Sequence, residues 1–204
     1  MKRILLALSL LSAMAIPGEA ASLVRSYSYY NVRGTTIEDI EKQISMHGPA
    51  IDNSGERHPG ATTMEFSTRV RYREYNDRCV VDGAQVTVRA KVVLPRWRDR
   101  RRATKGLQLI WDTLAADIKR HEESHLGIAK NYARKLEETL RALPRMRSCK
   151  DLSQRVEQET TRVLAQHDAE QDHFDEVESI NFESRLERLL NYRMEQIEAG
   201  RLRY

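Results

Sequence analysis

The sequence is poor in glycine, proline and cysteine, and each scarcity excludes a class of protein. With 9 glycines and 5 prolines in 204 residues, the chain is neither collagen-like nor a long disordered segment. Two cysteines cannot form a disulfide-rich scaffold. Apolar residues make up 40% of the chain and recur throughout. The chain can therefore bury the core of one ordinary domain, or of two small ones.

Excess charge and long apolar runs are also lacking. A net charge of +4 is too small to dictate binding to nucleic acid, so we expect no such partner. The apolar run over residues 4–16 is too short to span a bilayer about 30 Å thick. Lys2 and Arg3 precede the run and small residues follow it, which is typical of a secretory signal peptide. An uncleaved anchor is the alternative.

We accordingly expect residues 1–20 to be removed and the mature protein to be periplasmic or secreted, with no membrane span left. The two cysteines, Cys79 and Cys149, fit this location, because an even and small number of cysteines in an exported protein suggests one structural disulfide. Their separation excludes a CxxC redox site. A pair of zinc thiolates is the alternative, but no partner ligands lie nearby in the sequence.

The hydrophobic pattern of residues 21–102 predicts a small sheet. Aromatic and β-branched residues favour strands, and Asn76-Asp77 favours a turn between two of them. Ile37, Ile40 and Ile44 are spaced as in a helix that Thr35 or Thr36 can cap. We expect Pro95 to end the sheet. The predicted elements are strands at about 26–32, 62–75 and 79–95 and a short helix ending near residue 46.

From about Ala103 the apolar period changes to three or four residues, which predicts long amphipathic helices. We expect helices over about 103–143 and 151–180, and a third from Glu183 to Gly200. The predicted fold class is α+β: a small N-terminal antiparallel sheet with a short helix, followed by long packed helices. The expected organisation is a signal peptide (1–20), a metallopeptidase-like domain (21–182) and a charged helical extension (183–204).

The motif that indicates chemistry is His121-Glu122-Glu123-Ser124-His125, an HExxH within the first long helix. Residues four apart lie on one face of a helix, so the imidazoles of His121 and His125 can bind one zinc ion. Glu122 can then act as the general base on a zinc-bound water. The alternatives are two core histidines without a metal, and a zinc ion with a purely structural role.

A catalytic zinc usually has three protein ligands, and the third has to come from elsewhere in the chain. The continuation HExxHxxGxxH is absent. The source that we expect is the segment 167–173, which holds two histidines and several acidic residues. Helical periodicity alone slightly favours His167. An acidic ligand such as Glu170, or no third ligand, is also open.

Several short motifs, taken in order, resemble a family of bacterial proteins interpreted as secreted zinc-dependent proteases and long described as a domain of unknown function. The resemblance covers most of the chain after residue 20. It rests on residues 29–36, His47-Gly48-Pro49, Thr62-Thr63, Cys79, Leu94-Pro95, Trp111, the HExxH with Ile128-Ala129 after it, Cys149, and a late acidic segment ending in histidine.

The resemblance implies an exported zinc metallopeptidase. It also favours His173 as the third ligand and matches Asp168 to a carboxylate that could orient a ligand imidazole; a solvated helix charge is the alternative for Asp168. The late segment departs from the family's Tyr-Asp-x-x-Thr-x-His-Gly pattern, with His167 in place of Tyr, Gln171 in place of Thr and Phe174 in place of Gly. Ser124 stands where the family often has glycine.

The function that we expect is hydrolysis of peptide bonds by an exported zinc metallopeptidase, with zinc on His121, His125 and His173 and with Glu122 activating the zinc-bound water. Its substrate would be a peptide or protein of the cell envelope. One alternative is a non-catalytic envelope protein that keeps the fold, and perhaps a structural zinc, as a binding module. Another keeps the chemistry but cleaves a cell-wall amide.

Overall fold

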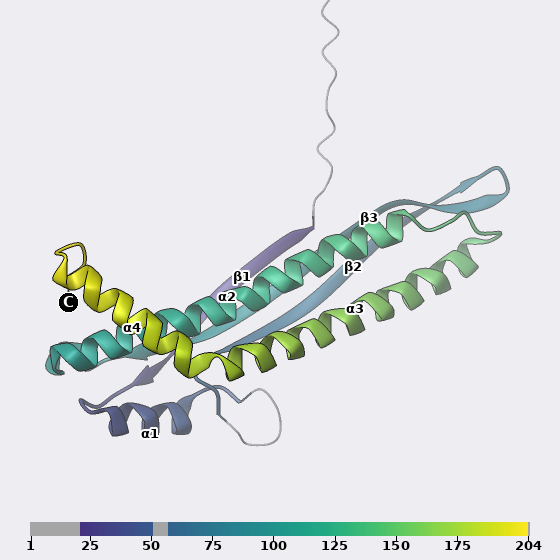
Figure 1. Cartoon of the computed structure of the whole chain (residues 1–204). Coiled ribbons are helices and arrows are strands. Elements are labelled where there is room, and N and C mark those ends of the chain that lie inside the picture. The colour runs from purple at the N-terminus through teal and green to yellow at the C-terminus, as the bar shows by residue number, and fades with distance from the viewer. Residues whose placement is uncertain (1–20, 51–56, 204) are drawn as a thin grey trace, which may run out of the picture.

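The structure is a computed structural model that describes residues 21–50 and 57–203. It has the predicted α+β architecture, with a three-stranded sheet near the N-terminus followed by long helices (Figure 1). The expected signal peptide lies outside the described residues. None of the helices within the described ranges is long and apolar enough to cross a membrane.

The sheet has the order β1-β3-β2, with β1 at Ser22–Val32, β2 at Ala61–Tyr75 and β3 at Arg78–Trp97. β2 and β3 form the expected antiparallel hairpin, and both turn residues, Asn76 and Asp77, adopt positive φ, as two-residue hairpin turns require. β1, however, pairs with β3 in parallel. The prediction of a wholly antiparallel sheet was wrong, because β1 is inserted next to the third strand rather than the second.

Pro95 does not end the sheet, contrary to the prediction. β3 continues to Trp97 beside β1. The first residue of β2, Ala61, pairs with Val93, so β2 is no longer beside the strand at residue 95. A proline without an N–H is tolerated where a strand has a neighbour on one side only.

The described residues form four α-helices in the predicted order. The short helix α1 (Ile37–His47) begins at Thr36, whose side chain accepts the backbone N–H of Asp39 in a capping box. The long helices are α2 (Lys105–Arg141), α3 (Cys149–Ile180) and α4 (Phe182–Glu198). Figure 1 shows α2 running along the sheet, α3 returning beside it, and α4 folding back across the first part of α2.

The apolar faces of the sheet and helices meet in the core. Alternate residues of β3 are buried, and the second half of α2 packs on them together with α3. A second cluster joins Trp111 near the start of α2 to Val32 of β1, Ile40 of α1 and Trp97 of β3. The main cluster includes Val86, Val88, Ala129, Ala133, Leu136, Leu140, Val156 and Val163. This packing fixes α2 on the sheet and α3 on α2, which positions the side chains described next.

The predicted disulfide is confirmed: Cys79 at the start of β3 is bonded to Cys149 at the start of α3, with 5.0 Å between their Cα atoms. Two backbone hydrogen bonds flank it, because Cys79 and Met146 each donate an N–H to the other's carbonyl at 2.9 and 3.0 Å. The bond therefore ties the β2–β3 hairpin to the connection between α2 and α3.

Candidate metal centre

His121 and His125 lie one helical turn apart near the middle of α2 and both face α3. Their Nε2 atoms are 3.1 Å apart. His125 is 9% exposed, and the ring of Phe174 packs against both imidazoles with 5.1 Å between ring centroids. The rings are therefore held in place by packing while their Nε2 atoms converge on one point.

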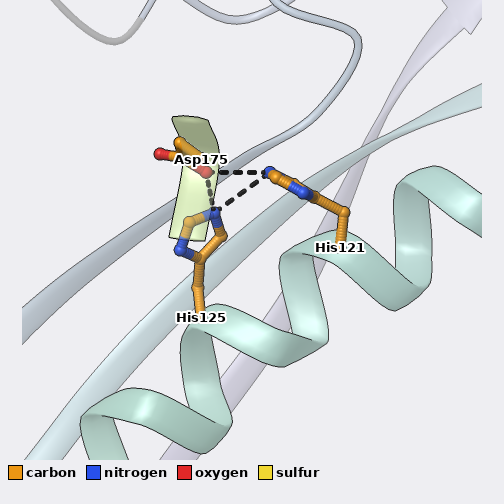
Figure 2. Close-up of side chains that lie close together, drawn as sticks. All are labelled: His121, His125 and Asp175. Atoms are coloured by element: carbon orange, nitrogen blue, oxygen red, sulfur yellow. Dashed lines mark hydrogen bonds and ion pairs between the residues drawn. The ribbon is translucent and has the colours of Figure 1, made fainter. Parts of the chain in front are cut away.

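Asp175 of α3 completes the cluster. Its Oδ1 lies 3.2 Å from His121 Nε2 and 3.1 Å from His125 Nε2, and Figure 2 shows the carboxylate pointing between the two rings. Among the described residues, these three side chains form the one group of His, Cys, Asp and Glu able to hold a metal ion. The Asp175 side chain is 53% exposed, so solvent reaches the cluster from this side.

Gln171 fixes the proton on His125. The amide nitrogen of Gln171 lies 3.3 Å from the backbone oxygen of His125, which can only accept, so the amide oxygen faces His125 Nδ1, 2.7 Å away. His125 Nδ1 must then carry the hydrogen and donate it. In its neutral form, His125 has a bare lone pair on Nε2, directed at the cluster.

The cluster fits a tetrahedral zinc ion. With zinc–ligand bonds of about 2.0–2.1 Å, two ligand atoms of a tetrahedron are about 3.3 Å apart, close to the 3.1–3.2 Å among these three atoms. The hydrogens available on the three ligand atoms also agree with a bound cation. While both imidazoles are neutral, His125 Nε2 and the carboxylate of Asp175 are both acceptors, and at most His121 Nε2 carries a hydrogen. A cation removes the resulting repulsion.

The other nitrogen of His121 faces an ion-pair network. Glu178 Oε2 lies 3.6 Å from His121 Nδ1, which is an electrostatic contact rather than a hydrogen bond. Arg120 and Arg185 both bind Glu178, and both also bind the buried Asp117. Burial would raise the pKa of Glu178, but the hydrogen bond and charge of Arg120 and the charge of Arg185 hold that pKa below its usual range. Glu178 therefore stays anionic beside His121.

Glu122 occupies a different side of α2. Its side chain reaches towards the start of β2, where Thr62 Oγ1 donates to Glu122 Oε2 at 2.8 Å. Gly60 leaves the necessary space, because a Cβ there would lie 2.6 Å from Glu122 Oε1. Burial raises the pKa of Glu122; the hydrogen bond from Thr62 and the charges of His121 and His125 oppose this rise in part. A raised carboxyl pKa suits a proton acceptor that works near neutral pH.

The structure brings His121 and His125 together as expected but places the other predicted residues elsewhere. His173 is exposed on α3 and is not part of the cluster. His167 is 5% exposed and contacts Gln171, Phe66 and Tyr132. Glu170 is exposed. Asp168 accepts from His167 Nδ1 at 2.9 Å, so it orients an imidazole that lies outside the cluster.

Asp175, which the sequence reasoning missed, could have been found by extending the apolar stripe of α3. Positions 167, 171 and 175 are spaced by four residues and lie on one helix face. Residue 173 lies about 200° around the helix axis from residue 175. The stripe containing His167 therefore leads to Gln171 and then to Asp175, whereas His173 lies on another side of the helix.

A cavity of about 360 Å³ adjoins Gln171, between β2 and α3. Met64, Phe66 and Leu164 give it an apolar wall, and His167, Asp168 and Gln171 give it a polar one. Two of its lining residues, His167 and Met64, contact the amide nitrogen of Gln171.

Fold and site together define an α+β protein with a two-histidine, one-carboxylate cluster between two packed helices. The chain belongs to the bacterial protein family of unknown function DUF922, whose profile matches residues 27–182. The match ends at the residue where α4 begins. No curated protein and no solved structure matches the chain significantly.

Proposed function

We propose that this protein is a zinc-dependent peptidase. The observation that supports this most directly is the convergence of His121 Nε2, His125 Nε2 and Asp175 Oδ1 at mutual distances of 3.1–3.2 Å. Three protein ligands with solvent access to the site are typical of a catalytic zinc centre, whereas structural zinc sites usually have four protein ligands. In this proposal Asp175 is the third ligand in place of His173, which the sequence analysis favoured.

Zinc at this site would act as a Lewis acid on a carbonyl oxygen and would make water more acidic. Glu122 is the residue proposed to accept the proton from the attacking water and to deliver it to the leaving nitrogen. Thr62 and Gly60 position its carboxylate, and burial raises its pKa. Glu178 keeps a negative charge beside Nδ1 of His121, and Gln171 accepts a hydrogen bond from Nδ1 of His125.

An exported location is part of the proposal. The Cys79–Cys149 disulfide supports it, because disulfides persist in oxidising compartments and are rare in the bacterial cytoplasm. The pattern of residues 1–20 supports it as well. Substrates would then be peptides or proteins of the cell envelope.

Metal analysis combined with one isosteric substitution tests the proposal. Protein purified without chelator should contain about one zinc ion per chain, because the cluster provides one tetrahedral site. Glu122→Gln should keep that zinc and lose peptide hydrolysis by at least about 100-fold, because an amide cannot accept the proton. Glu123→Gln is the matched control. Its partner is the hydroxyl of Tyr27, an amide oxygen can still accept from it, and hydrolysis should be unchanged.

A binding module that keeps zinc without hydrolysis is the second candidate. The observation that favours it is the hydrogen bond between Glu122 and Thr62, which holds the carboxylate against β2. Zinc content with no hydrolysis of a peptide library or of purified peptidoglycan would favour this candidate.

Hydrolysis of peptidoglycan alone would show that the bond cleaved is a cell-wall amide. Equal hydrolysis by Glu122→Gln and the unaltered protein would remove Glu122 from the mechanism.

A further inference from the structure

Four polar side chains form an unbroken line from the surface of α3 to the metal cluster. Asp168 Oδ1 meets His167 Nδ1 at 2.9 Å, His167 Nε2 meets Gln171 Nε2 at 2.9 Å, and Gln171 Oε1 meets His125 Nδ1 at 2.7 Å. Asp168 is exposed, whereas His167, Gln171 and His125 are at most 9% exposed. Three of these four residues belong to α3, and His125 belongs to α2.

The direction of every hydrogen bond in this line is fixed by its neighbours. The backbone oxygen of His125 can only accept, so it orients the amide nitrogen of Gln171 towards itself. That nitrogen also faces His167 Nε2 and can only donate, so His167 Nε2 carries no hydrogen. The hydrogen of neutral His167 is then on Nδ1, where Asp168 accepts it. At the other end, the amide oxygen requires a hydrogen on Nδ1 of His125.

We propose that Gln171 is a positioning residue that locks His125 as the Nδ1–H tautomer, and that His167 and Asp168 hold Gln171 in the orientation needed to do so. The fixed Nδ1–H tautomer leaves a lone pair on His125 Nε2 that points to the metal position before any metal binds. This role of Gln171 rests on the proposed function only in assigning a metal to the cluster. A residue behind a metal-binding histidine usually affects metal affinity by about 10–100-fold.

No other feature of its surroundings explains why residue 171 is a glutamine. It is 8% exposed and lies beside Met64 and Phe66, surroundings in which leucine or methionine would pack without needing partners. Both ends of the amide have partners: the oxygen has His125 Nδ1, and the nitrogen has His125 O and His167 Nε2. Glutamine satisfies all of them because it offers a donor and an acceptor on one planar group.

The first test is the tautomer of each histidine in the metal-free full-length protein. Long-range ¹H–¹⁵N NMR correlations at about pH 8 distinguish Nδ1–H from Nε2–H for neutral imidazoles, whose usual pKa is about 6.5. His125→Gln and His167→Gln would assign the two residues. We expect both His125 and His167 as Nδ1–H. An Nε2–H tautomer, or a mixture of tautomers, at His125 would overturn the proposal whatever the protein hydrolyses.

The second test is zinc affinity, measured by competition with a chromophoric chelator. Gln171→Met keeps nearly the same shape without the amide, and we expect about 10–100-fold weaker zinc binding and mixed tautomers at His125. Gln166→Met is the matched control, because Gln166 is an exposed glutamine of the same helix whose side chain accepts a hydrogen bond from the exposed Lys135. Its zinc affinity should equal that of the unaltered protein.

The third variant separates positioning from packing. Gln171→Glu keeps an acceptor for His125 Nδ1–H but loses the donor to His125 O and to His167 Nε2. We expect zinc affinity within a few-fold of the unaltered protein, with His125 still Nδ1–H, while His167 Nε2 now carries a hydrogen that it donates to the carboxylate at position 171. Weakened zinc binding in Gln171→Met, rescued by Gln171→Glu, supports the proposal. If Gln171→Met lowered only the thermal midpoint and left zinc affinity and the His125 tautomer unchanged, Gln171 would be a packing residue and the proposal would be overturned.

Failure of this proposal and failure of the proposed function give different results. If Glu122→Gln hydrolysed peptides as well as the unaltered protein, the assigned general base would be wrong, yet the tautomer of His125 and its dependence on residue 171 would stand. If His125 were Nε2–H and Gln171→Met bound zinc normally, the positioning role would be lost, yet hydrolysis and its dependence on Glu122 would stand.

Discussion

At the end of the molecule that carries the disulfide, α2 and α3 face each other and the sheet through aliphatic side chains such as Leu136, Leu140 and Leu152, all without exposed surface. At the other end, the same two helices meet through imidazoles, an amide and carboxylates. The two regions belong to one continuous helix pair, so the difference arises from side chains rather than from backbone geometry.

The two kinds of contact contribute differently to the fold. Aliphatic contacts stabilise in proportion to buried area and tolerate many arrangements. Polar contacts contribute little net stability each but are costly when left unpaired. Among the described residues, no buried side-chain nitrogen or oxygen lacks a partner. The disulfide end therefore supplies stability, and the cluster end uses it to hold groups in one defined arrangement.

The largest expected effect on stability is loss of the disulfide. Replacing Cys79 and Cys149 together by alanine should lower the free energy of unfolding by about 4 kcal/mol in the chain-entropy model for a closed loop of this size. Urea denaturation of the oxidised protein and of the variant measures it. Zinc affinity of the folded variant should be unchanged. A marked loss of zinc affinity would show that the two ends are not separable.

Leu136→Ala comes next. Leu136 is fully buried in the main cluster, and truncating such a side chain costs about 2–5 kcal/mol through lost burial and the cavity left behind. Urea denaturation checks this value. Leu202→Ala is the control, because Leu202 is 40% exposed, and it should change the free energy of unfolding by less than about 0.5 kcal/mol.

At the polar end, stability should depend on pH through Asp117. Burial raises its pKa, but hydrogen bonds from Arg185 and Arg120 outweigh burial and hold the pKa below the usual value. A carboxyl with a lowered folded-state pKa contributes stability above its unfolded pKa of about 4 and loses it as the pH falls through the folded-state value. Unfolding measured from pH 6 to pH 2 should show this decline.

Asp117→Asn should be less stable than the unaltered protein at pH 6, with a smaller further loss on acidification. Asp172→Asn, an exposed change on α3, is the control and should reproduce the pH profile of the unaltered protein. Equal pH profiles for Asp117→Asn and the unaltered protein would contradict the assignment.

Gly60→Ala should have the smallest effect on stability and a selective effect on the site. The new methyl group would lie 2.6 Å from Glu122 Oε1 and 2.9 Å from Ile118 Cγ2, so both the carboxylate and the Ile118 side chain have to move, at a cost of about 1 kcal/mol. Zinc should remain bound while peptide hydrolysis falls. Gly127→Ala is the control: its Cβ meets nothing within 4 Å, and alanine favours a helix by up to about 1 kcal/mol. Normal hydrolysis by Gly60→Ala would show that Glu122 needs no fixed position.

The fold followed from the sequence wherever one residue pattern governed one element. The apolar period of α2, the Asn76-Asp77 turn and the cysteine pair predicted structure correctly. The parallel pairing of β1 with β3 did not follow, because strand order depends on how three strands cover the helices. Pro95 suggested a strand end because proline lacks the backbone N–H that a central strand needs. The sequence does not show that β2 has already ended beside this part of β3.

For the candidate site, sequence spacing placed His121 and His125 on one helix face, because both belong to the same element. A residue from α3 depends on the rotation of that helix about its axis, which is set by Val156, Val163 and His167 packing against β2, β3 and α2. That rotation selects Asp175 and turns His173 to solvent. The role of Gln171 was not predicted: the family resemblance marked it only as a replacement for threonine, and a single glutamine on an apolar stripe has no motif.

The disulfide lies too far from the metal cluster to position Asp175 precisely. Asp175 lies 26 residues after Cys149 along α3, which is about 39 Å at a rise of about 1.5 Å per residue. A rotation of 3° about the tied end would displace the carboxylate by about 2 Å, whereas metal–ligand distances tolerate about 0.2 Å. Tying the chain at Cys149 therefore cannot by itself aim Asp175. The position of Asp175 depends on the side chains that pack along α3 between Cys149 and Asp175. A change at Val163, far from both of these residues, should therefore affect metal binding.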